Sequence, residues 1–513
     1  MVPKRWVAMG FVGFPLLVLP VPVLAAEKCV IVAGYASSGE RESMDPSDQL
    51  SSDDTMMIYA TYNRLINLDE NLNVIPELAK SWEVSPDGKT WTFHLEQGVK
   101  FHDGHEMTSA DVVYSFRRLK DPKLASGAAA LLTSFDPNEV RAADKYTVQI
   151  TTKEPNAELP ITLANKFGLI VPDGAKHEDL RLHENGTGPF VQEQFTPGGA
   201  SRVLRRNPNY WRSTSTNAVP AADCLKQIII TEPISAASAV QSGQVDLLLS
   251  VDPSLLTSLK NDQNVKLLKT KTSSLFDLAM QVDKPPFDDV RVRQALKLVV
   301  DRQQMVDTVL LGYGTPGNDN PIPPDWPDAY THESRSRDIA KAKQLLAEAG
   351  HPDGLSVDLY TSDSPAAMSK MAEAYQQMAA EAGIKVNLIK TPAESYWDQI
   401  WLKKPFLTSY WALRPTGEFL SLAFAGSSSW NETNWKRADF DKLLSEARSE
   451  MDLGKRTALY QQAQRMLTDE GGAIVPMFFY RVAAIRANCD GFTPHPQDTN
   501  INFEHLRCKR GPA

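Results

Sequence analysis

Residues 77–119 constrain the fold of this chain more than any other segment, because they spell out a run of regular elements. Residues 82–84 and 91–95 alternate large apolar and polar side chains, as half-buried strands do. Pro-Asp-Gly at residues 86–88 is a turn signal between these two runs. The pattern therefore predicts a β-hairpin.

A capped helix should follow this hairpin. His-Asp-Gly at residues 102–104 turns the chain again, and Thr108 and Asp111 are spaced like a capping box. Their side chains can accept hydrogen bonds from the first N–H groups of a helix over residues 112–119. The segment predicts a mixed unit of strands and a helix.

The N-terminus has the composition of an export signal. Lys4 and Arg5 precede an apolar run over residues 7–24 that contains three prolines and ends in small residues. We expect a cleavable signal over residues 1–25, and a membrane anchor is the alternative. Lipidation of Cys29 is disfavoured because charged and bulky residues precede it. The segment therefore predicts a soluble protein that is exported from the cytoplasm.

Length and charge limit the remaining classes. Removing about 25 residues from the 513-residue chain leaves far more than one ordinary core accommodates, so at least two lobes are expected. The net charge is −9, and loss of the two positive signal residues leaves the mature chain near −11. This balance, and the absence of a basic stripe, disfavour nucleic acid as a partner.

The cysteines suggest disulfide bonds. There are four of them, Cys29, Cys224, Cys489 and Cys508, and no C-x-x-C spacing. Cys29 and Cys224 each precede an apolar strand, so they can pair if those strands are neighbours in a parallel sheet. Cys489–Cys508 would then tie down the C-terminus. Free buried thiols are the alternative.

Strands and helices alternate through most of the chain, which predicts α/β lobes with mixed sheets. The clearest unit is strand 355–360, a helix that Ser364 can cap and that runs to residue 382, and strand 384–388. There is no repeat and no low-complexity linker. We therefore expect the lobes to be joined by ordered strands.

Several strings resemble the peptide/nickel (family 5) solute-binding proteins of bacterial ABC transporters. The matching strings are PELAKSW and GVKFHDG within residues 77–104, TSADVVYS at 108–115, MDP at 44–46, GTGPF at 186–190, RRNPNYW at 205–211 and PPFDDVRVRQAL at 285–296. Glu96 departs from the arginine usual in the family. The resemblance implies a two-lobed clamp, like a type II periplasmic binding protein with an extra subdomain and mixed β-sheets.

The resemblance also suggests a division of the chain. The expected parts are the signal at 1–25, the lobe I core at 26–55, 187–270 and 487–513, an extra subdomain of lobe I at 56–186, and lobe II at 271–486.

Motifs for catalysis, cofactors or metals are weak. Gly312-Tyr-Gly-Thr-Pro-Gly317 matches the dinucleotide fingerprint in spacing, but it follows a helical stretch and leads into prolines. His102 and His105 lie in a predicted turn, and no H-E-x-x-H, P-loop or nucleophile elbow occurs. We expect no catalytic residue, no cofactor and no protein-bound metal.

The segment 410–419 is the expected ligand loop. In the family, its motif order resembles a loop with a tryptophan and then an aspartate that holds a peptide's ammonium group. Here Trp411 is present, but Leu413 replaces the aspartate and Arg414 lies beside it. An arginine fork suits a carboxylate or phosphate, and an indole offers a stacking face. Alternatively, Trp411 packs the loop and Arg414 pairs with Glu418.

A second wall is expected from residues 427–435, which are rich in side chains that stack and hydrogen-bond. These residues could equally form a structured surface loop. The predicted ligand-binding residues are Tyr410, Trp411, Arg414, Thr416, Trp430 and Asn431.

The predicted function is capture of a small polar, carboxylate-bearing solute, such as a modified peptide or an opine-like conjugate. A monomeric protein would deliver it to an inner-membrane ABC permease. An ordinary di- or oligopeptide binder and a metal-chelate carrier are alternatives within this class. A secreted hydrolase is the alternative from another class, and a role in chemoreception could coexist with transport.

Overall fold

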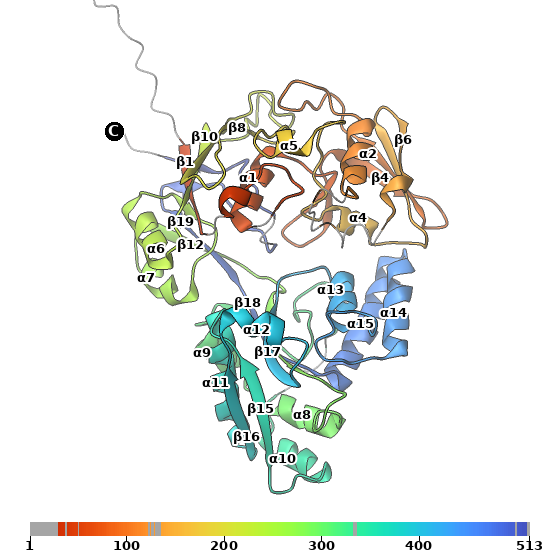
Figure 1. The fold of residues 1–513 in the computed structure, drawn as a ribbon, viewed down its shortest axis with the longest axis vertical. Helices are drawn as coiled ribbons and strands as arrows, with labels where there is room; N and C mark the ends of the chain where they lie inside the picture. Colours follow the sequence, from red (N-terminus) through yellow and green to blue (C-terminus); the bar gives the residue numbers. More distant parts are fainter. Residues whose placement is uncertain are drawn as a thin grey trace, which may run out of the picture.

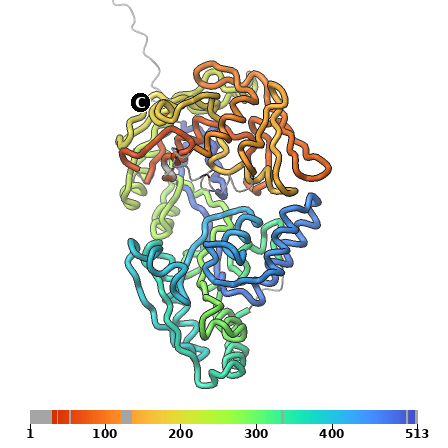
Figure 2. The backbone as a smooth tube through the Cα atoms, turned by 45° about the vertical axis from the view of Figure 1, so that its right-hand side comes forward, coloured from red at the N-terminus to blue at the C-terminus, as the bar shows by residue number. Residues whose placement is uncertain are grey.

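The computed structural model describes residues 29–35, 38–49, 51–121, 124, 128, 135–331, 336–497 and 500–509, so the predicted signal over residues 1–25 lies outside the described part. Two lobes lie one above the other, and the tube in Figure 2 shows the chain passing between them. No helix in the described part is long and apolar enough to cross a membrane.

The lobes are joined by two ordered connections, as predicted. Residues 271–274 link β12 (Val265–Thr270) to β13 (Leu275–Met280), and Tyr480 links β18 (Ala473–Phe479) to β19 (Arg481–Arg486). The two connections also bond to each other: the Phe479 N–H donates to the Ser274 carbonyl at 3.0 Å. Relative motion of the lobes therefore involves both connections together.

Lobe I is built on a seven-stranded sheet with the order β12-β19-β11-β1-β10-β9-β8. Its other strands are β1 Cys29–Gly34, β8 Phe190–Gln194, β9 Ser201–Arg206, β10 Cys224–Ile229 and β11 Leu247–Leu248. Strands β1 and β10 are parallel neighbours, with Cys29 opposite Cys224. The structure forms both predicted disulfides, Cys29–Cys224 and Cys489–Cys508.

The predicted hairpin and helix form a unit of lobe I that has a sheet and a core of its own. Its sheet has the order β4-β5-β7-β6, with β4 Ala79–Val84, β5 Thr90–Leu95, β6 Val140–Asp144 and β7 Thr147–Thr151. Thr108 and Asp111 make the expected reciprocal capping box at the start of α2 (Ser109–Arg118). Buried Phe93, Val112 and Val148 belong to one core beneath the sheet.

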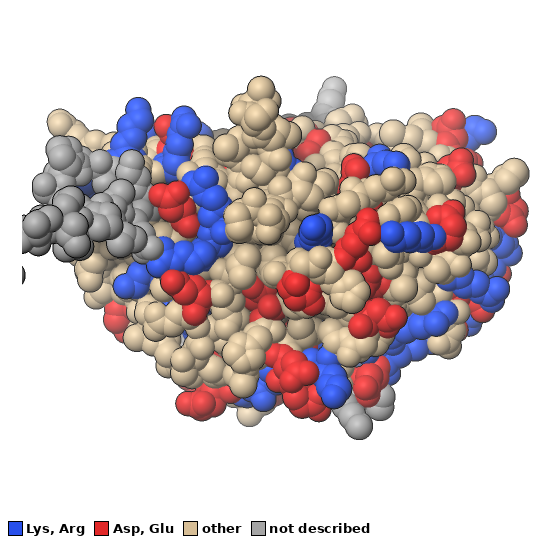
Figure 3. Space-filling view, turned by 90° about the horizontal axis from the view of Figure 1, so that it is seen from above, with Lys and Arg blue, Asp and Glu red and all other residues tan. Residues whose placement is uncertain are grey.

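The other α-helices in the described part of lobe I are α1 Ser52–Thr61, α4 Leu159–Leu163, α5 His177–Leu180, α6 Pro233–Ser242 and α7 Leu256–Lys260. Two small two-stranded sheets complete it, β2 Ile66–Leu68 with β3 Val74–Pro76 and β20 Cys489–Asp490 with β21 Arg507–Cys508. Basic and acidic side chains are interspersed over the face of lobe I drawn in Figure 3.

Lobe II is built on a six-stranded sheet with the order β14-β18-β13-β17-β15-β16. Its further strands are β14 Gly314–Pro316, β15 Leu355–Thr361, β16 Ile384–Lys390 and β17 Phe406–Trp411. Its helices are α8 Val290–Leu298, α9 Arg302–Val309, α10 Ile339–Glu348, α11 Ala366–Ala380, α12 Ala393–Gln399, α13 Thr416–Phe424, α14 Ala438–Ser449 and α15 Leu453–Glu470.

The predicted β-α-β unit is present as β15, α11 and β16, with the two strands parallel. The expected cap was wrong in detail. Pro365 occupies the N-cap position of α11, and no side-chain cap bonds to the helix start. Gly383 follows the helix at φ +80°, a left-handed conformation that glycine adopts without a Cβ penalty.

Two of the expected boundaries between parts of the chain differ from the observed strand pairing and core packing. Strand β19 falls inside the segment expected for lobe II, yet it pairs with β12 and β11 in the lobe I sheet. Helix α1 extends past residue 56, but Met56, Met57 and Ala60 belong to the same core as Val30 and Phe190 of that sheet. The chain returns to lobe I at Tyr480 because β19 completes a buried sheet there.

The strings that resemble the family meet in space. Asp45 of the MDP string binds Arg118 of α2 through two hydrogen bonds of 3.0 and 2.6 Å. His102 of the FHDG string donates from one ring nitrogen to Glu184 at 2.5 Å and from the other to the Gly188 carbonyl at 3.0 Å. These residues hold the segments of lobe I together.

Candidate functional site

The candidate site lies where the parallel strands β15 and β17 of lobe II end. The chain leaves β15 for β16 on one side, and after β17 it passes through α13–α15 to β18 on the other side. Ligands of open α/β sheets bind at such switch points, outside the carboxyl ends of the strands. Trp411, the last residue of β17, pairs with Leu275, which directly follows one connection to lobe I.

Figure 1 shows α12 and α13 at the end of lobe II that lies nearest to lobe I. The ligand loop itself touches lobe I, because Leu413 packs with Leu68, Leu72 and Ala164 in one apolar cluster. The candidate site is therefore at the end of lobe II that faces lobe I.

Five aromatic side chains form what we call the aromatic platform: Trp397, Trp401, Tyr410, Trp411 and Trp430. Ring centroids are 5.5 Å apart for Trp397–Tyr410 and for Trp401–Trp430, 5.9 Å for Trp397–Trp401 and 6.1 Å for Trp411–Trp430. Trp397, Tyr410 and Trp430 are 37%, 40% and 43% exposed, whereas Trp411 is 4% exposed. The platform thus has an open outer row and an inner row, in which Trp411 is buried and Trp401 is partly buried.

A buried glutamate holds the inner row in place. The indole N–H groups of Trp401 and Trp411 donate to the two carboxylate oxygens of Glu432, each at 2.7 Å. Glu432 is fully buried. Sequence reasoning missed this arrangement, because a glutamate next to Asn431 looks like an ordinary surface residue.

A second acid lies beneath Glu432. Asp277 is a fully buried residue of β13, and its side chain hydrogen-bonds Glu432. Burial, and then the charge of Glu432, raise the pKa of Asp277 well above its ordinary value. The raised pKa favours a proton on Asp277, at the contact between the two carboxyl groups.

Arg414 lies beside the platform, with its guanidinium 5.5 Å from the centre of the Trp411 ring. Its Nε is 3.5 Å from Glu418, and one Nη donates to the Ala412 carbonyl at 3.1 Å. The side chains of Arg414 and Glu418 are 24% and 45% exposed. The alternative expected from the sequence, pairing of Arg414 with Glu418, is thus present in this structure.

Thr416 and Asn431 differ from the expectation of direct ligand contact. Thr416 is 6% exposed at the first position of α13, and its hydroxyl bonds Asp328. Asn431 is 5% exposed and donates from its amide to the Trp435 carbonyl at 2.9 Å and to the Phe424 carbonyl at 3.2 Å. Both residues hold the backbone of the site, because their polar groups are bonded inside lobe II.

A polar contact between the lobes lies next to the ligand loop. Glu158 of lobe I accepts a hydrogen bond from the Tyr460 hydroxyl of α15. A Cβ atom at Gly417 would lie 2.2 Å from both the Glu158 carboxylate and that hydroxyl, so glycine leaves room for this contact. The Ala157 N–H also donates to the Arg448 carbonyl at 2.9 Å. No motif in the sequence indicated Glu158.

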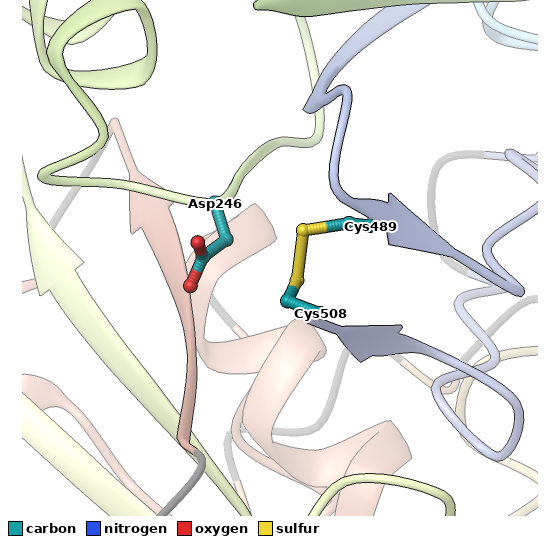
Figure 4. Close-up of side chains that lie close together, drawn as sticks. All are labelled: Asp246, Cys489 and Cys508. Carbon is teal, nitrogen blue, oxygen red and sulfur yellow. A yellow bond between two sulfur atoms is a disulfide. The ribbon is translucent and has the colours of Figure 1, made fainter. Parts of the chain in front are cut away.

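One group of potential metal ligands lies in lobe I, away from the platform. Figure 4 shows Asp246 beside the Cys489–Cys508 disulfide. Both sulfurs are bonded to each other, and the carboxylate of Asp246 accepts the Ile31 N–H at 2.8 Å. A thiolate is the sulfur form that binds metals, so the oxidised protein offers no cation site here.

Comparisons with known proteins match this chain to one family over most of its length. Residues 73–432 match the family model of bacterial extracellular solute-binding proteins, family 5 Middle. The chain is 27% identical to the glutathione-binding protein GsiB of Salmonella typhi, over 98% of this chain and 99% of that protein. It is 30% identical to heme-binding protein A of Haemophilus influenzae, over 92% of this chain and 96% of that protein.

A solved structure has the same fold. The periplasmic binding protein AgaA of A. tumefaciens R10, in complex with agropinic acid, has a TM-score of 0.74 at 25% identity. The match covers 94% of this chain and 99% of that chain.

Proposed function

Because the chain belongs to the bacterial extracellular solute-binding proteins of family 5, we propose that its cargo is a small carboxylate-bearing organic solute. As a member of this family, the chain is a periplasmic-type substrate-binding protein of an ABC transporter and not an enzyme. A modified peptide or an opine-like conjugate fits the proposed cargo.

The observation that carries the proposal is the position of Arg414. Its guanidinium lies at the switch point, over the Trp411 ring, and is partly exposed. The present partner, Glu418, is 3.5 Å away and its side chain is half-exposed, so a solute carboxylate can replace it. A planar guanidinium binds a carboxylate through two parallel hydrogen bonds. Glutathione and agropinic acid, named for two relatives, both carry carboxylates.

The burial of Leu413 favours an acidic cargo over a free peptide. It is buried against apolar residues of lobe I, in the part of the loop where a peptide binder needs an acid for the ammonium group. An ammonium group placed there would lose its hydration without gaining a counter-charge. We therefore propose that the cargo presents an anion to this loop.

Capture requires no covalent step. The two connections allow the lobes to move toward each other, and a solute favours the arrangement in which it gains contacts from both lobes. We further propose that a monomer exported to the periplasm releases the unaltered solute to an inner-membrane permease.

The first test is recovery of the natural cargo. Mass spectrometry of solute retained by gently purified protein should find an organic acid of unchanged structure. Recovery of a neutral solute, or of a chemically altered one, would contradict the proposal.

The second test removes the arginine. Calorimetry with the recovered acid should show that Arg414→Ala loses about 1.5–3 kcal/mol of binding free energy, the usual worth of a charged hydrogen bond. Arg465→Ala is the matched control, because Arg465 and Asp469 form a similar i,i+4 pair on α15. Equal affinities for wild type and Arg414→Ala would remove Arg414 from the site.

The third test removes the carboxylate that competes with the solute for Arg414. Glu418→Gln eliminates the carboxylate that now pairs with Arg414. Binding of the acid should strengthen by about 0.5–1 kcal/mol, the size of an exposed ion pair. Weaker binding would mean that Glu418 itself supports the bound solute.

A further inference from the structure

The outer row of the aromatic platform is apolar surface that the fold leaves uncovered. Trp397, Tyr410 and Trp430 come from α12, β17 and the loop after α13, yet their rings are linked. Trp397 and Trp430 both pack on Trp401, and Tyr410 packs on Trp397. Each exposes more than a third of its surface. Grouped apolar exposure on a folded protein marks an interaction site more often than scattered exposure does.

The platform is rigid, which distinguishes it from rings that are exposed by chance. Trp401 and Trp411 are fixed through their N–H groups by the buried carboxylate of Glu432. Trp430 packs on both, with centroid distances of 5.5 and 6.1 Å. A pre-organised aromatic surface binds a ring or chain with little loss of side-chain entropy.

The position of the platform indicates what it holds. It lies at the same strand ends as Arg414, which stacks on Trp411, the ring that also supports Trp430. A cationic group and an apolar surface therefore adjoin in one site. This combination is complementary to an amphipathic acid, in which a carboxylate and an apolar group belong to one molecule.

We propose that Trp397, Tyr410 and Trp430 bind an apolar ring or chain of the cargo while Arg414 binds its carboxylate. The cargo class is then an amphipathic organic acid, and a small hydrophilic acid binds weakly. This inference rests on the proposed function and adds the second recognition element to it.

A graded set of probes tests the inference. N-acetyl-, N-hexanoyl- and N-phenylacetyl-glutamate share one acid and differ in the apolar group. Calorimetry with the full-length mature protein should give an affinity that rises at least about tenfold from the acetyl to the phenylacetyl probe, because the larger group buries more apolar surface.

Two variants locate the apolar contact. Trp397→Ala and Trp430→Ala should each reduce the preference for the phenylacetyl probe over the acetyl probe to within about threefold. Ile234→Ala is the control, since Ile234 is 71% exposed on α6 of lobe I. Near-UV circular dichroism of each variant checks that lobe II remains folded.

The outcomes separate the two proposals. Equal affinities for the three probes, with Arg414 still required, overturn the platform inference and leave the proposed function in place. Binding of no probe also overturns the inference, and the mass of the retained solute then judges the proposed function separately. Concentration-dependent dimers that Trp430→Ala abolishes would overturn the inference as well, because a second copy of the chain would then cover the platform.

Discussion

Asp45 in lobe I and Asp277 in lobe II are both almost completely buried, but their surroundings differ. Asp45 lies against the guanidinium of Arg118 and accepts the Ser47 N–H at 2.8 Å. Asp277 lies against another carboxyl group, Glu432, whose charge is stabilised by two indole N–H groups. One site holds a matched ion pair, and the other holds a proton between two acids.

The pKa values shift in opposite directions. Burial alone raises the pKa of Asp45, but the hydrogen bonds and charge of Arg118 outweigh burial and leave it below the ordinary value. Burial and Glu432 both raise the pKa of Asp277. Both disulfides also lie in lobe I. The comparison indicates that the Asp45 site is held by an ion pair, in the lobe that carries both disulfides, whereas the Asp277 site tolerates a charge mismatch beneath the platform.

The largest effect should come from breaking the matched pair. Arg118→Met leaves the Asp45 carboxylate buried without its main cation, which should lower the free energy of unfolding by about 3–5 kcal/mol. Urea unfolding near neutral pH measures the loss, and hydrogen exchange of α2 peptides assigns it to lobe I. Arg117→Met is the control, because Arg117 is exposed on the same helix.

The pH dependence of this variant also changes sign. In the wild type, the lowered pKa of Asp45 contributes stability that is present above its unfolded value and is lost as the pH falls. Without Arg118, burial dominates and the same group destabilises the fold as the pH rises. An unchanged pH profile in Arg118→Met would show that Ser47 and His177, which also bond Asp45, suffice to keep it ionised.

The same two sites show what the sequence can predict. Thr108, Asp111 and the hairpin before them were predictable, because capping boxes and alternating strands depend on near neighbours in the chain. The Cys29–Cys224 pairing was predictable from two strand entrances once parallel pairing was assumed. Strand β19 was assigned to the wrong lobe, because an apolar strand carries no mark of the sheet that it joins.

The candidate site was predictable only in part. The structure gathers Trp411, Trp430 and Arg414, as the sequence suggested, but it turns the amide of Asn431 inward. The Asp277–Glu432 contact was not predictable, because pattern rules place acids in solvent or beside cations. Only the packing of a strand against a distant loop brings these two acids together.

A smaller effect, opposite in sign, should follow from replacing Asp277, one acid of the buried pair, with an amide. Asp277→Asn keeps a hydrogen-bond donor toward Glu432 and removes the carboxyl group whose pKa is raised. In the wild type, the folded state holds a proton on Asp277 at pH values where the unfolded state has already lost it. The free energy of unfolding therefore falls as the pH rises from the unfolded pKa to the raised folded pKa, by up to about 1.4 kcal/mol per pH unit.

Asp277→Asn should lack that slope and be more stable than the wild type at neutral pH. Urea unfolding between about pH 4 and pH 8, followed by the tryptophan fluorescence that lobe II dominates, measures both quantities. Asp283→Asn serves as the control, because Asp283 is exposed just after β13. Parallel pH profiles for wild type and Asp277→Asn would mean that the Asp277 carboxyl is ionised in the folded protein.

The smallest effect is expected at Glu158, a third kind of acid site, where the partner is a neutral hydroxyl from the other lobe. Tyr460→Phe removes the hydrogen bond to Glu158 and should weaken contact between the lobes by about 0.5–1.5 kcal/mol. Small-angle scattering should show a more open average shape, and affinity for the cargo should fall by a similar amount because closure then costs more. Tyr375→Phe separates closure from stability, since the Tyr375 hydroxyl donates to the Leu296 carbonyl within lobe II. Both variants could unfold more easily while neither changes the shape or the affinity for the cargo. The Glu158–Tyr460 contact would then only stabilise the fold, and the three acid sites would differ in their effect on stability alone.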